Sequence, residues 1–515
     1  NDSEPSADSA NARPKPIVVN KYAYKEDGRG FIGDLHSRLW VFDLATRTAT
    51  QITAGDADDG EPAWSPDGSR IAFVSMREPD ADRYFNGDVY VVAATAGAVP
   101  RRMTTFHGSD GGPLSWSTDG SQVAYRQGQE PKDFGYDGGF GVVALAPAAG
   151  GEPRLLTAKY DRAIFGARWS TDGRYIFGTV SDDMHEYLVR VAPTNGAVER
   201  FVIPGLTPSE FSAGKDGEFA IVATSPAKPG ELYAFNGSAA RQLTHMNAWI
   251  DEIALSTTEA VTSRSDDGTE VHGVLRKPAG ATSGARLPLV VRIHGGPAAQ
   301  SAFEFDFERE LITAQGYAVL APNYRGSSGR GAAFTLAVSG NWCDPEVRDI
   351  RGMVNHLISA GVADESRLGV GGWSYGGILT DCLIAADQRF KAATSGAGVS
   401  NVLGMYGHDQ YTVQYDLELG QPWKNVEKWL NMSKAFMNAD KIKTPTLFLG
   451  GAVDWNVPLL GSEQMYQALK SNRIETELIV YPGETHSITR PSFQKDRLDR
   501  YIAWYKKYLA TPTVP

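Results

Sequence analysis

Gly372-Trp373-Ser374-Tyr375-Gly376 is the most informative stretch of this 515-residue sequence. It follows an apolar run that ends near Gly371 and precedes an apolar, helix-like segment, residues 378–386. A serine flanked by glycines between a strand and a helix is typical of a nucleophile elbow, because the serine backbone is strained there and larger neighbours would collide with the adjacent strand or helix. The motif therefore predicts an α/β domain that presents Ser374 at a sharp turn.

Two residues that could activate this serine follow it in the order Ser, Asp, His. Asp454 comes just after the apolar run 446–449, and His486 comes just after the run 477–481. A serine hydroxyl needs a general base, and the base needs a carboxylate that fixes its tautomer. We predict that Ser374, Asp454 and His486 form a catalytic triad on one rim of the sheet. The alternative, a surface-loop histidine and a turn-forming aspartate, is weakened because all three residues follow strands.

An oxyanion also needs backbone N–H donors beside the serine. His294-Gly295-Gly296-Pro297 follows the apolar run 287–293 and can present one donor, since glycine permits close approach; the amide of Tyr375 is the other. The sequence leaves open whether His294 points at the site or packs under the loop.

The rest of the C-terminal half alternates between strand-like and helix-like segments. Short apolar runs bounded by Gly or Pro occur at 287–293, 317–321, 367–370, 446–449 and 477–481, and helix-like segments occur at 347–360 and 462–469. This alternation predicts a parallel sheet covered by helices.

The N-terminal half contains a repeat. Trp-Ser-x-Asp-Gly begins at Trp64, Trp116 and Trp169, with a weaker copy at Phe211, and each Trp follows a hydrophobic-Thr pair by 11 or 12 residues. Strand-like runs follow each Asp-Gly turn, which is typical of β-propeller blades, and residues 21–252 have room for about four to five. The alternative, a recurring hairpin turn in another β-sandwich, does not explain why both markers keep one register.

Composition excludes several function classes. The chain has 50 Lys+Arg, 61 Asp+Glu and 42% hydrophobic residues, so it can bury a core and lacks the basic blocks of a nucleic-acid-binding protein. It has no apolar run long enough to span a membrane and no CxxC or HExxH pair, so we expect no membrane partner, no metal and no cofactor. We expect Cys382 to pack as a thiol on the helix after the serine; pairing with Cys343 in an oxidising compartment is the alternative.

Two glycine-rich segments have non-catalytic explanations. The loop 323–331 could cradle a phosphate, but its glycines do not fit a phosphate-binding pattern, and a structural turn is favoured. Gly369, Gly371 and Gly372 begin a dinucleotide-like spacing, but Ser374 replaces the third glycine, so that interpretation is rejected.

Together these motifs resemble the prolyl oligopeptidase family of serine peptidases, in which a β-propeller covers an α/β-hydrolase domain. The resemblance extends from about residue 21 over nearly the whole chain. It is carried by His294-Gly-Gly-Pro, Asn323-Tyr-Arg-Gly, Gly372-Trp-Ser-Tyr-Gly-Gly, Gly420-Gln-Pro-Trp, Lys443-Thr-Pro, Asp454-Trp-Asn-Val-Pro and Tyr481-Pro-Gly-Glu-Thr-His. The elbow resembles the dipeptidyl peptidase IV branch, whereas the first and last motifs are closer to the acylaminoacyl-peptidase and dipeptidyl-peptidase 5 branch.

The resemblance implies roles for further residues. The amides of Gly296 and Tyr375 would form the oxyanion hole. Tyr375, Val399, Val402 and Val457 would line a small apolar pocket for the residue before the scissile bond, and Asn456 would hold a substrate carbonyl. In family members that bind a free amine, acidic residues on the propeller side grip it; Glu130, Asp133 and Glu210 are candidates here, and nothing selects among them.

The resemblance also implies a domain division. We expect an N-terminal tail at 1–20, a propeller portion at 21–252, an α/β-hydrolase domain at 253–511 and a short tail at 512–515. Family propellers usually have about seven or eight blades, so we expect a separate N-terminal chain, cleaved from a common precursor, to complete the propeller. The polar start at Asn1 favours an exported protein, periplasmic or secreted, with a cytoplasmic location as the alternative.

The leading functional hypothesis is a serine exopeptidase or oligopeptidase that cleaves short, dipeptidyl or N-acylated substrates. An amidase or esterase acting on a small non-peptide molecule would use the same site. A propeller scaffold with an inert hydrolase domain is the third alternative. The sequence leaves open endo- versus exopeptidase action and whether the chain forms homo-oligomers.

Overall fold

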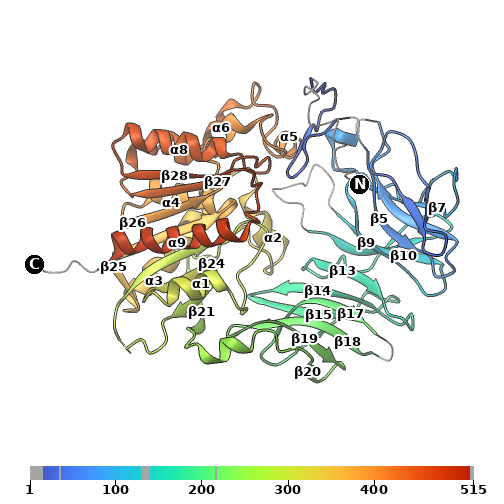
Figure 1. The fold of residues 1–515 in the computed structure, drawn as a ribbon, viewed down its shortest axis with the longest axis horizontal. Coiled ribbons are helices and arrows are strands. Elements are labelled where there is room, and N and C mark those ends of the chain that lie inside the picture. Colours follow the sequence, from blue (N-terminus) through green and yellow to red (C-terminus); the bar gives the residue numbers. More distant parts are fainter. Residues whose placement is uncertain are drawn as a thin grey trace, which may run out of the picture.

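The computed structural model describes residues 16–33, 36–79, 81–128, 140–214, 217–282 and 284–510. Two bodies lie side by side: sheets from the N-terminal half on the right of Figure 1, and an α/β domain from the C-terminal half on the left. The change from one to the other falls between β20, which ends at Gln242, and β21, which begins at Thr257.

The N-terminal half forms successive antiparallel sheets, each built from consecutive strands. The two-stranded sheets are β1 (Lys25–Glu26) with β2 (Gly30–Phe31), and β3 (Trp40–Asp43) with β4 (Thr48–Gln51). The four-stranded sheets are β5 (Asp59–Trp64), β6 (Arg70–Ser75), β7 (Asp88–Ala93), β8 (Arg101–Arg102); β9 (Asp110–Trp116), β10 (Gln122–Gln127), β11 (Val142–Pro147), β12 (Arg154–Leu155); β13 (Ile164–Trp169), β14 (Ile176–Asp182), β15 (His185–Val191), β16 (Val198–Phe201); and β17 (Thr207–Ala213), β18 (Phe219–Ser225), β19 (Lys228–Phe235), β20 (Ala240–Gln242).

The two sequence markers of the repeat have structural roles within each sheet. In the first copy the Trp-Ser-x-Asp-Gly motif makes the turn from β5 to β6, where Ser65 Oγ donates to Asp67 Oδ1 at 2.6 Å and Gly68 adopts φ +69°. The second marker is the hydrophobic-Thr pair, and its threonine binds the third strand of a sheet. Thr104 Oγ1 accepts from the Val89 N–H on β7 at 2.9 Å, and Thr157 Oγ1 accepts from the Val143 N–H on β11 at 2.9 Å. The repeat is therefore a unit of one sheet, as a propeller blade requires.

The β3–β4 sheet differs from the four sheets that follow it. It has two strands where they have four. On β3, the side chains of Trp40 and Phe42 are each 57% exposed. This sheet therefore leaves two aromatic residues of one strand exposed, whereas β5 and β13 each expose one, Trp64 at 51% and Phe165 at 41%.

The α/β domain contains one eight-stranded sheet in the order β21-β22-β24-β23-β25-β26-β27-β28. Its strands are β21 (Thr257–Arg264), β22 (Glu270–Lys277), β23 (Leu287–Ile293), β24 (Ala318–Asn323), β25 (Ala363–Trp373), β26 (Phe390–Gly396), β27 (Thr446–Gly451) and β28 (Thr476–Tyr481). The pairs from β24 through β28 are parallel, whereas β21 and β22 pair antiparallel. The predicted parallel sheet is thus present, with an antiparallel hairpin at one edge.

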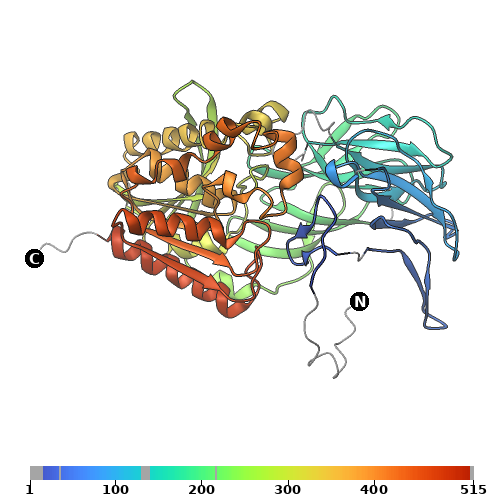
Figure 2. The ribbon, with the colours of Figure 1, turned by 90° about the horizontal axis from the view of Figure 1, so that it is seen from above.

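Helices cover both faces of this sheet (Figure 2). They are α1 (Phe307–Thr313), α2 (Ala332–Thr335), α3 (Pro345–Ser359), α4 (Tyr375–Ala386), α5 (Thr412–Glu418), α6 (Val426–Met432), α7 (Lys434–Met437), α8 (Leu459–Ser471) and α9 (Pro491–Leu509). One hydrophobic cluster contains buried residues of α3, α4 and α8, and a second contains buried residues of α1 and α9. None of the helices in the described ranges is long and apolar enough to cross a bilayer.

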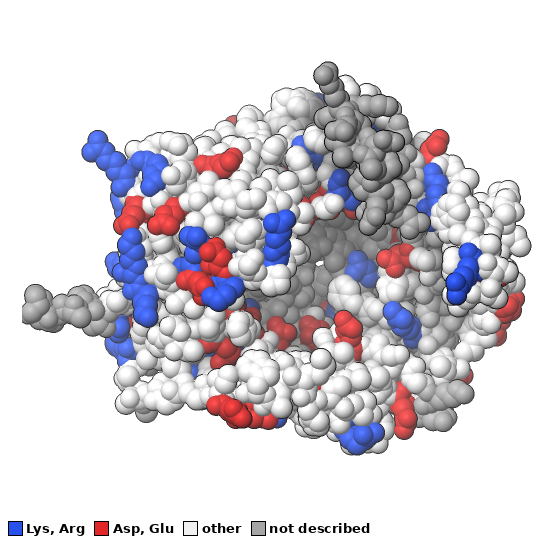
Figure 3. Space-filling view, in the orientation of Figure 1, with Lys and Arg blue, Asp and Glu red and all other residues white. Residues whose placement is uncertain are grey.

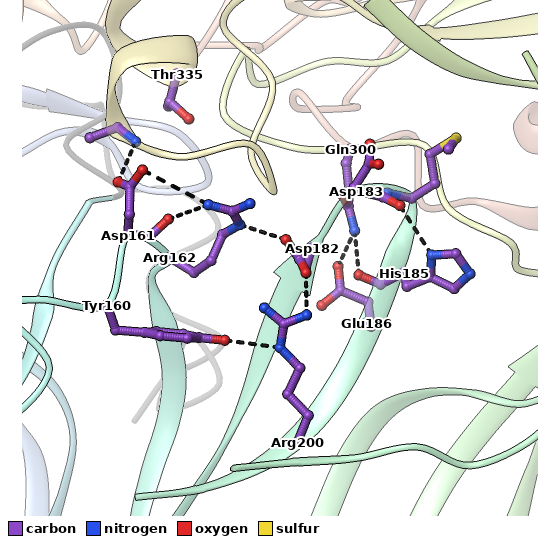
Figure 4. A network of polar contacts seen from close by, with 12 residues as sticks. Tyr160, Asp161, Arg162, Asp182, Asp183, His185, Glu186, Arg200, Gln300 and Thr335 are labelled. Atoms are coloured by element: carbon purple, nitrogen blue, oxygen red, sulfur yellow. Dashed lines mark hydrogen bonds and ion pairs between the residues drawn. The ribbon is translucent and has the colours of Figure 1, made fainter. Parts of the chain in front are cut away.

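The turn between β14 and β15 connects the two bodies (Figure 4). Asp183 Oδ1 lies 2.7 Å from His272 Nδ1, and the Asp183 N–H donates to the Gly329 carbonyl at 3.1 Å. The Met184 N–H donates to Gln300 Oε1 at 3.2 Å, and the Met184 side chain is buried against residues of β22 and β24. A hairpin of the sheet-rich half is therefore anchored in the α/β domain, close to the segment that follows His294–Pro297.

A disulfide joins Cys343, just before α3, to Cys382 on α4, with Cα atoms 5.7 Å apart. This differs from the expectation that Cys382 packs as a thiol. The two cysteines are 39 residues apart in sequence, and it is the packing of α3 beside α4 that brings them together.

Removing this cross-link should lower the urea midpoint of unfolding. For a closed loop of this length, the restricted unfolded chain corresponds to roughly 3–4 kcal/mol of unfolding free energy. The double variant Cys343→Ala/Cys382→Ala and the reduced wild-type protein should both show the decrease, and the reduced protein controls for side-chain volume. Identical midpoints for oxidised and reduced wild type would contradict this expectation.

Candidate active site

Ser374 lies at a sharp turn between β25 and α4. Its backbone has φ +62° and ψ −126°, outside the regions that L-residues favour, and its N–H donates to the Gly396 carbonyl at 3.0 Å. A Cβ on Gly372 would lie 2.5 Å from the Gly376 carbonyl carbon and 2.6 Å from the Ile293 oxygen, so only glycine fits there. The predicted elbow geometry is present.

Asp454 and His486 meet on the same rim, on the loops that follow β27 and β28. His486 Nδ1 lies 2.8 Å from Asp454 Oδ2, and Asp454 Oδ1 accepts from the N–H groups of Asn456 at 2.9 Å and Val457 at 2.7 Å. The Asp454 carboxylate thus has a partner for each oxygen. Burial raises the pKa of this carboxyl, and the hydrogen bond with His486 opposes the rise. The arrangement fixes the imidazole ring with Nε2 left for another partner.

The indole of Trp373 links the histidine loop to the elbow. Its Nε1 donates to the His486 carbonyl at 3.1 Å, and the two rings lie 6.3 Å apart between centroids. Because Trp373 directly precedes Ser374, the backbone positions of the serine and the histidine are coupled.

The loop His294–Pro297 contacts the elbow from the other side. A Cβ on Gly295 would lie 3.1 Å from the Trp373 carbonyl oxygen and 3.3 Å from the Ser374 Cβ. Gly296 adopts φ +123°, which other residues rarely reach. The backbone of this loop therefore lies against the serine, where oxyanion donors are needed.

His294 packs under this loop. Its ring stacks on Tyr324 with centroids 4.5 Å apart, its Nδ1 lies 2.8 Å from the Gly295 carbonyl oxygen, and its Nε2 lies 3.0 Å from Ser327 Oγ. Burial lowers the pKa of His294 to about 4, so the ring is neutral at pH 7. Of the two alternatives that the sequence left open, the structure favours the packing role.

Four of the residues expected to bind substrate belong to the hydrophobic core of the α/β domain. Tyr375, Val399, Val402 and Val457 are buried in the same hydrophobic cluster. The Tyr375 hydroxyl donates to Glu346 Oε1 at 2.5 Å, and burial raises the pKa of Glu346 to about 7. Asn456 Oδ1 accepts from the Tyr411 hydroxyl, a partner that the sequence did not suggest. Their contacts with a substrate stay predictions.

The other candidates have structural partners, are exposed, or lie outside the described residues. Glu130 and Asp133 fall outside those residues, and Glu210 is exposed on β17. In the loop 323–331, Arg325 pairs with Asp267 and Asp349 at 2.6 Å each, so its guanidinium is held within the protein. This agrees with the expectation that the loop is a structural turn. Within the described ranges, no group of three or more His, Cys, Asp and Glu is arranged to hold a metal ion.

The rim faces the sheet-rich half of the molecule. The carboxyl ends of β27 and β28 point toward it (Figures 1 and 2). The surface is hollowed between the two bodies, and acidic side chains lie along the lower edge of the hollow (Figure 3). A substrate reaching Ser374 would pass between the two halves.

This combination of successive four-stranded sheets with an eight-stranded α/β sheet that carries a serine elbow is that of a propeller-bearing α/β hydrolase. The uncomplexed acylaminoacyl peptidase of Pyrococcus horikoshii has the same fold, with a TM-score of 0.83 at 21% identity over 98% of this chain and 80% of that one.

Sequence comparisons agree with the fold. The model of the prolyl oligopeptidase family matches residues 303–511. An uncharacterized peptidase of Bacillus subtilis, YuxL, is 29% identical over 96% of this chain and 78% of its own length. Dipeptidyl-peptidase 5 of Porphyromonas gingivalis is 23% identical over 90% of this chain and 71% of its own length. Residues 303–511 thus match the prolyl oligopeptidase family, which confirms the resemblance inferred from the sequence, and the similar peptidases support a serine peptidase.

Replacement of Gly295 by alanine should reduce activity without unfolding the domain. The added methyl would displace the loop from Trp373 and Ser374 by a few tenths of an ångström, and misplacements of this order cost about tenfold in kcat/KM. Gly60→Ala on β5 is the matched control, because a Cβ there meets no atom within 4 Å. Equal kcat/KM for the two variants would show that close contact at Gly295 is unimportant.

Proposed function

We propose that the protein hydrolyses short peptides, N-terminally acylated or dipeptidyl, through an acyl-enzyme on Ser374. The observation that carries the proposal is the 2.8 Å contact between His486 Nδ1 and the buried Asp454 carboxylate, on the rim that also presents Ser374. A general base that is oriented by a buried carboxylate is what a serine nucleophile needs.

In the proposed reaction, His486 Nε2 takes the proton from Ser374 Oγ while Oγ attacks the carbonyl carbon of the substrate. The N–H groups of Gly296 and Tyr375 hold the resulting oxyanion. His486 then gives the proton to the leaving amine, the C–N bond breaks, and an ester to Ser374 remains. Water, deprotonated by His486, attacks this ester and releases the acid, which restores the serine.

Two features support a small peptide as the substrate. The sheet-rich half faces the rim, which would exclude folded proteins from Ser374. Similar proteins bear the names acylaminoacyl peptidase and dipeptidyl-peptidase 5. In this proposal Tyr375, Val399, Val402 and Val457 line the pocket for the residue before the scissile bond, and Asn456 holds a substrate carbonyl.

We also propose that a further polypeptide covers the β3–β4 sheet and completes the propeller. The exposed Trp40 and Phe42 on a two-stranded sheet support this, because a propeller buries such strand faces between blades. Native mass spectrometry of the protein isolated from its source should show this chain bound to a second, different polypeptide. A fully active particle made of this chain alone would contradict the proposal.

The Cys343–Cys382 disulfide supports an oxidising compartment, periplasmic or extracellular. Fractionation of the source cells, with thiols alkylated before lysis, should recover the chain outside the cytoplasm with both cysteines protected. Recovery from the cytoplasm with alkylated cysteines would contradict this location.

Hydrolysis of three matched chromogenic substrates tests the activity: a free-amine dipeptidyl anilide, an N-acyl-aminoacyl anilide and a simple ester. We expect one of the two anilides to be the best substrate, no turnover by Ser374→Ala, and a decrease in kcat of about 10⁴-fold for Asp454→Asn, the size known for this change in another serine protease. Activity on the ester alone would instead identify a small-molecule esterase, and turnover that survives Ser374→Ala would exclude the triad.

A further inference from the structure

The hairpin formed by β1 and β2 is near the N-terminus in sequence, but it lies against the catalytic domain (Figure 2). The hydroxyl of Tyr24 donates to the Gly407 carbonyl, and Lys25 Nζ donates to the His408 carbonyl at 2.8 Å. The Phe31 ring packs edge-on against Trp455 with centroids 5.6 Å apart. The hairpin is therefore seated on the segments around residues 407–410 and on the loop that carries Asp454.

Asp27, at the turn of this hairpin, binds both catalytic loops with one carboxylate. Its Oδ1 accepts from the Trp455 N–H at 2.9 Å, and its Oδ2 accepts from the His486 N–H at 3.1 Å. Trp455 directly follows Asp454 in the sequence. A single side chain thus bridges the backbone of the histidine to the backbone beside the aspartate.

The surrounding contacts hold this carboxylate in place. The Asp27 N–H donates to Gln410 Oε1 at 2.8 Å, and the Gln410 N–H donates to the Trp455 carbonyl at 3.0 Å. Asp27, Gln410 and Trp455 therefore form a closed set of hydrogen bonds. The bridge needs two acceptor oxygens, because both partners are N–H donors; an asparagine would turn its own NH₂ toward one of them.

The carboxylate also acts on the charge balance of the site. Burial is the main cause of the raised pKa of Asp454, and the negative charge of Asp27 adds to it. Two other charged groups are close by: Asp409, whose pKa burial raises to about 7, and Lys25, whose pKa burial lowers. Loss of the Asp27 charge would make protonation of the Asp454 carboxylate less favourable.

We propose that Asp27 is a positioning residue of the active site, which sets the distance between Asp454 and His486 by bridging their loops. The proposal rests on the function proposed above for the triad. Under this proposal the N-terminal hairpin contributes to the geometry of the active site. Asp27 is thereby linked to Trp455 and His486, which lie about 430 and 460 positions further along the sequence.

The test compares Asp27→Asn with Glu26→Gln in the full chain. Glu26 is the neighbouring carboxylate of the same hairpin, and within the described part of the chain it pairs with nearby Arg29 at 2.7 Å. For Asp27→Asn we expect a 10- to 100-fold decrease in kcat, about the cost of a small misplacement, with KM little changed. The acid limb of the kcat/KM profile should move to lower pH, and fluorophosphonate labelling of Ser374 should slow. Glu26→Gln should match the wild type in each measurement.

Two further measurements separate this proposal from the others. Amide hydrogen exchange should speed up in the peptides that contain Trp455 and His486 in Asp27→Asn, whether or not the protein is active. If the wild type is never labelled at Ser374 but exchange is faster in Asp27→Asn, the proposed function is overturned and the bridging role of Asp27 is retained. If a folded Asp27→Asn variant has the kcat, pH profile and exchange rates of the wild type, the bridging role of Asp27 is overturned.

The variant Tyr24→Phe weakens only the attachment of the hairpin and should cost less activity than Asp27→Asn. An equal loss of activity in the two variants would also overturn the bridging role.

Discussion

The left-handed backbone at Ser374 is the constraint on which the site depends. A non-glycine residue at φ +62° is held there at a cost of about 1–3 kcal/mol, which the surrounding structure must offset. Here β23 and β26 pack on both sides of β25, and α4 begins at the next residue. Gly372 and Gly376 have no Cβ because backbone atoms of neighbouring elements occupy that space. The serine is thus exposed to the rim by a turn that only dense packing can maintain.

The proposed partners of the serine come from segments that the sheet brings to the same edge. The Asp454 carboxylate and the His486 ring are placed by loops at the ends of β27 and β28, and Trp373 and Asp27 each bind the histidine backbone. These contacts join the elbow, two loops and the N-terminal hairpin into one unit. The hydrogen bond from the Met184 N–H on the β14–β15 turn to Gln300 joins the sheet-rich half to the α/β domain.

Sequence reasoning predicted those features that local pattern determines. The elbow, the Ser-Asp-His order, the repeat and the parallel sheet all depend on residues close together in the chain or on periodicity. It missed features created by tertiary packing. Cys343 and Cys382 meet because α3 and α4 pack together, His294 turns under its loop because Tyr324 offers a ring to stack on, and Asp27 reaches His486 across 459 residues. An aspartate in a Glu-Asp-Gly turn carries no signal of such a contact, because this is an ordinary turn sequence.

The central claim is that a substrate acyl group passes through Ser374. Rapid acid quench of the enzyme with an activated ester substrate, followed by mass spectrometry of the whole protein and its peptides, tests it most directly. The account predicts a covalent adduct with the mass of the acyl group on the peptide that contains Ser374, and its absence from Ser374→Ala. Steady turnover of the substrate with the acyl group on another residue would contradict it.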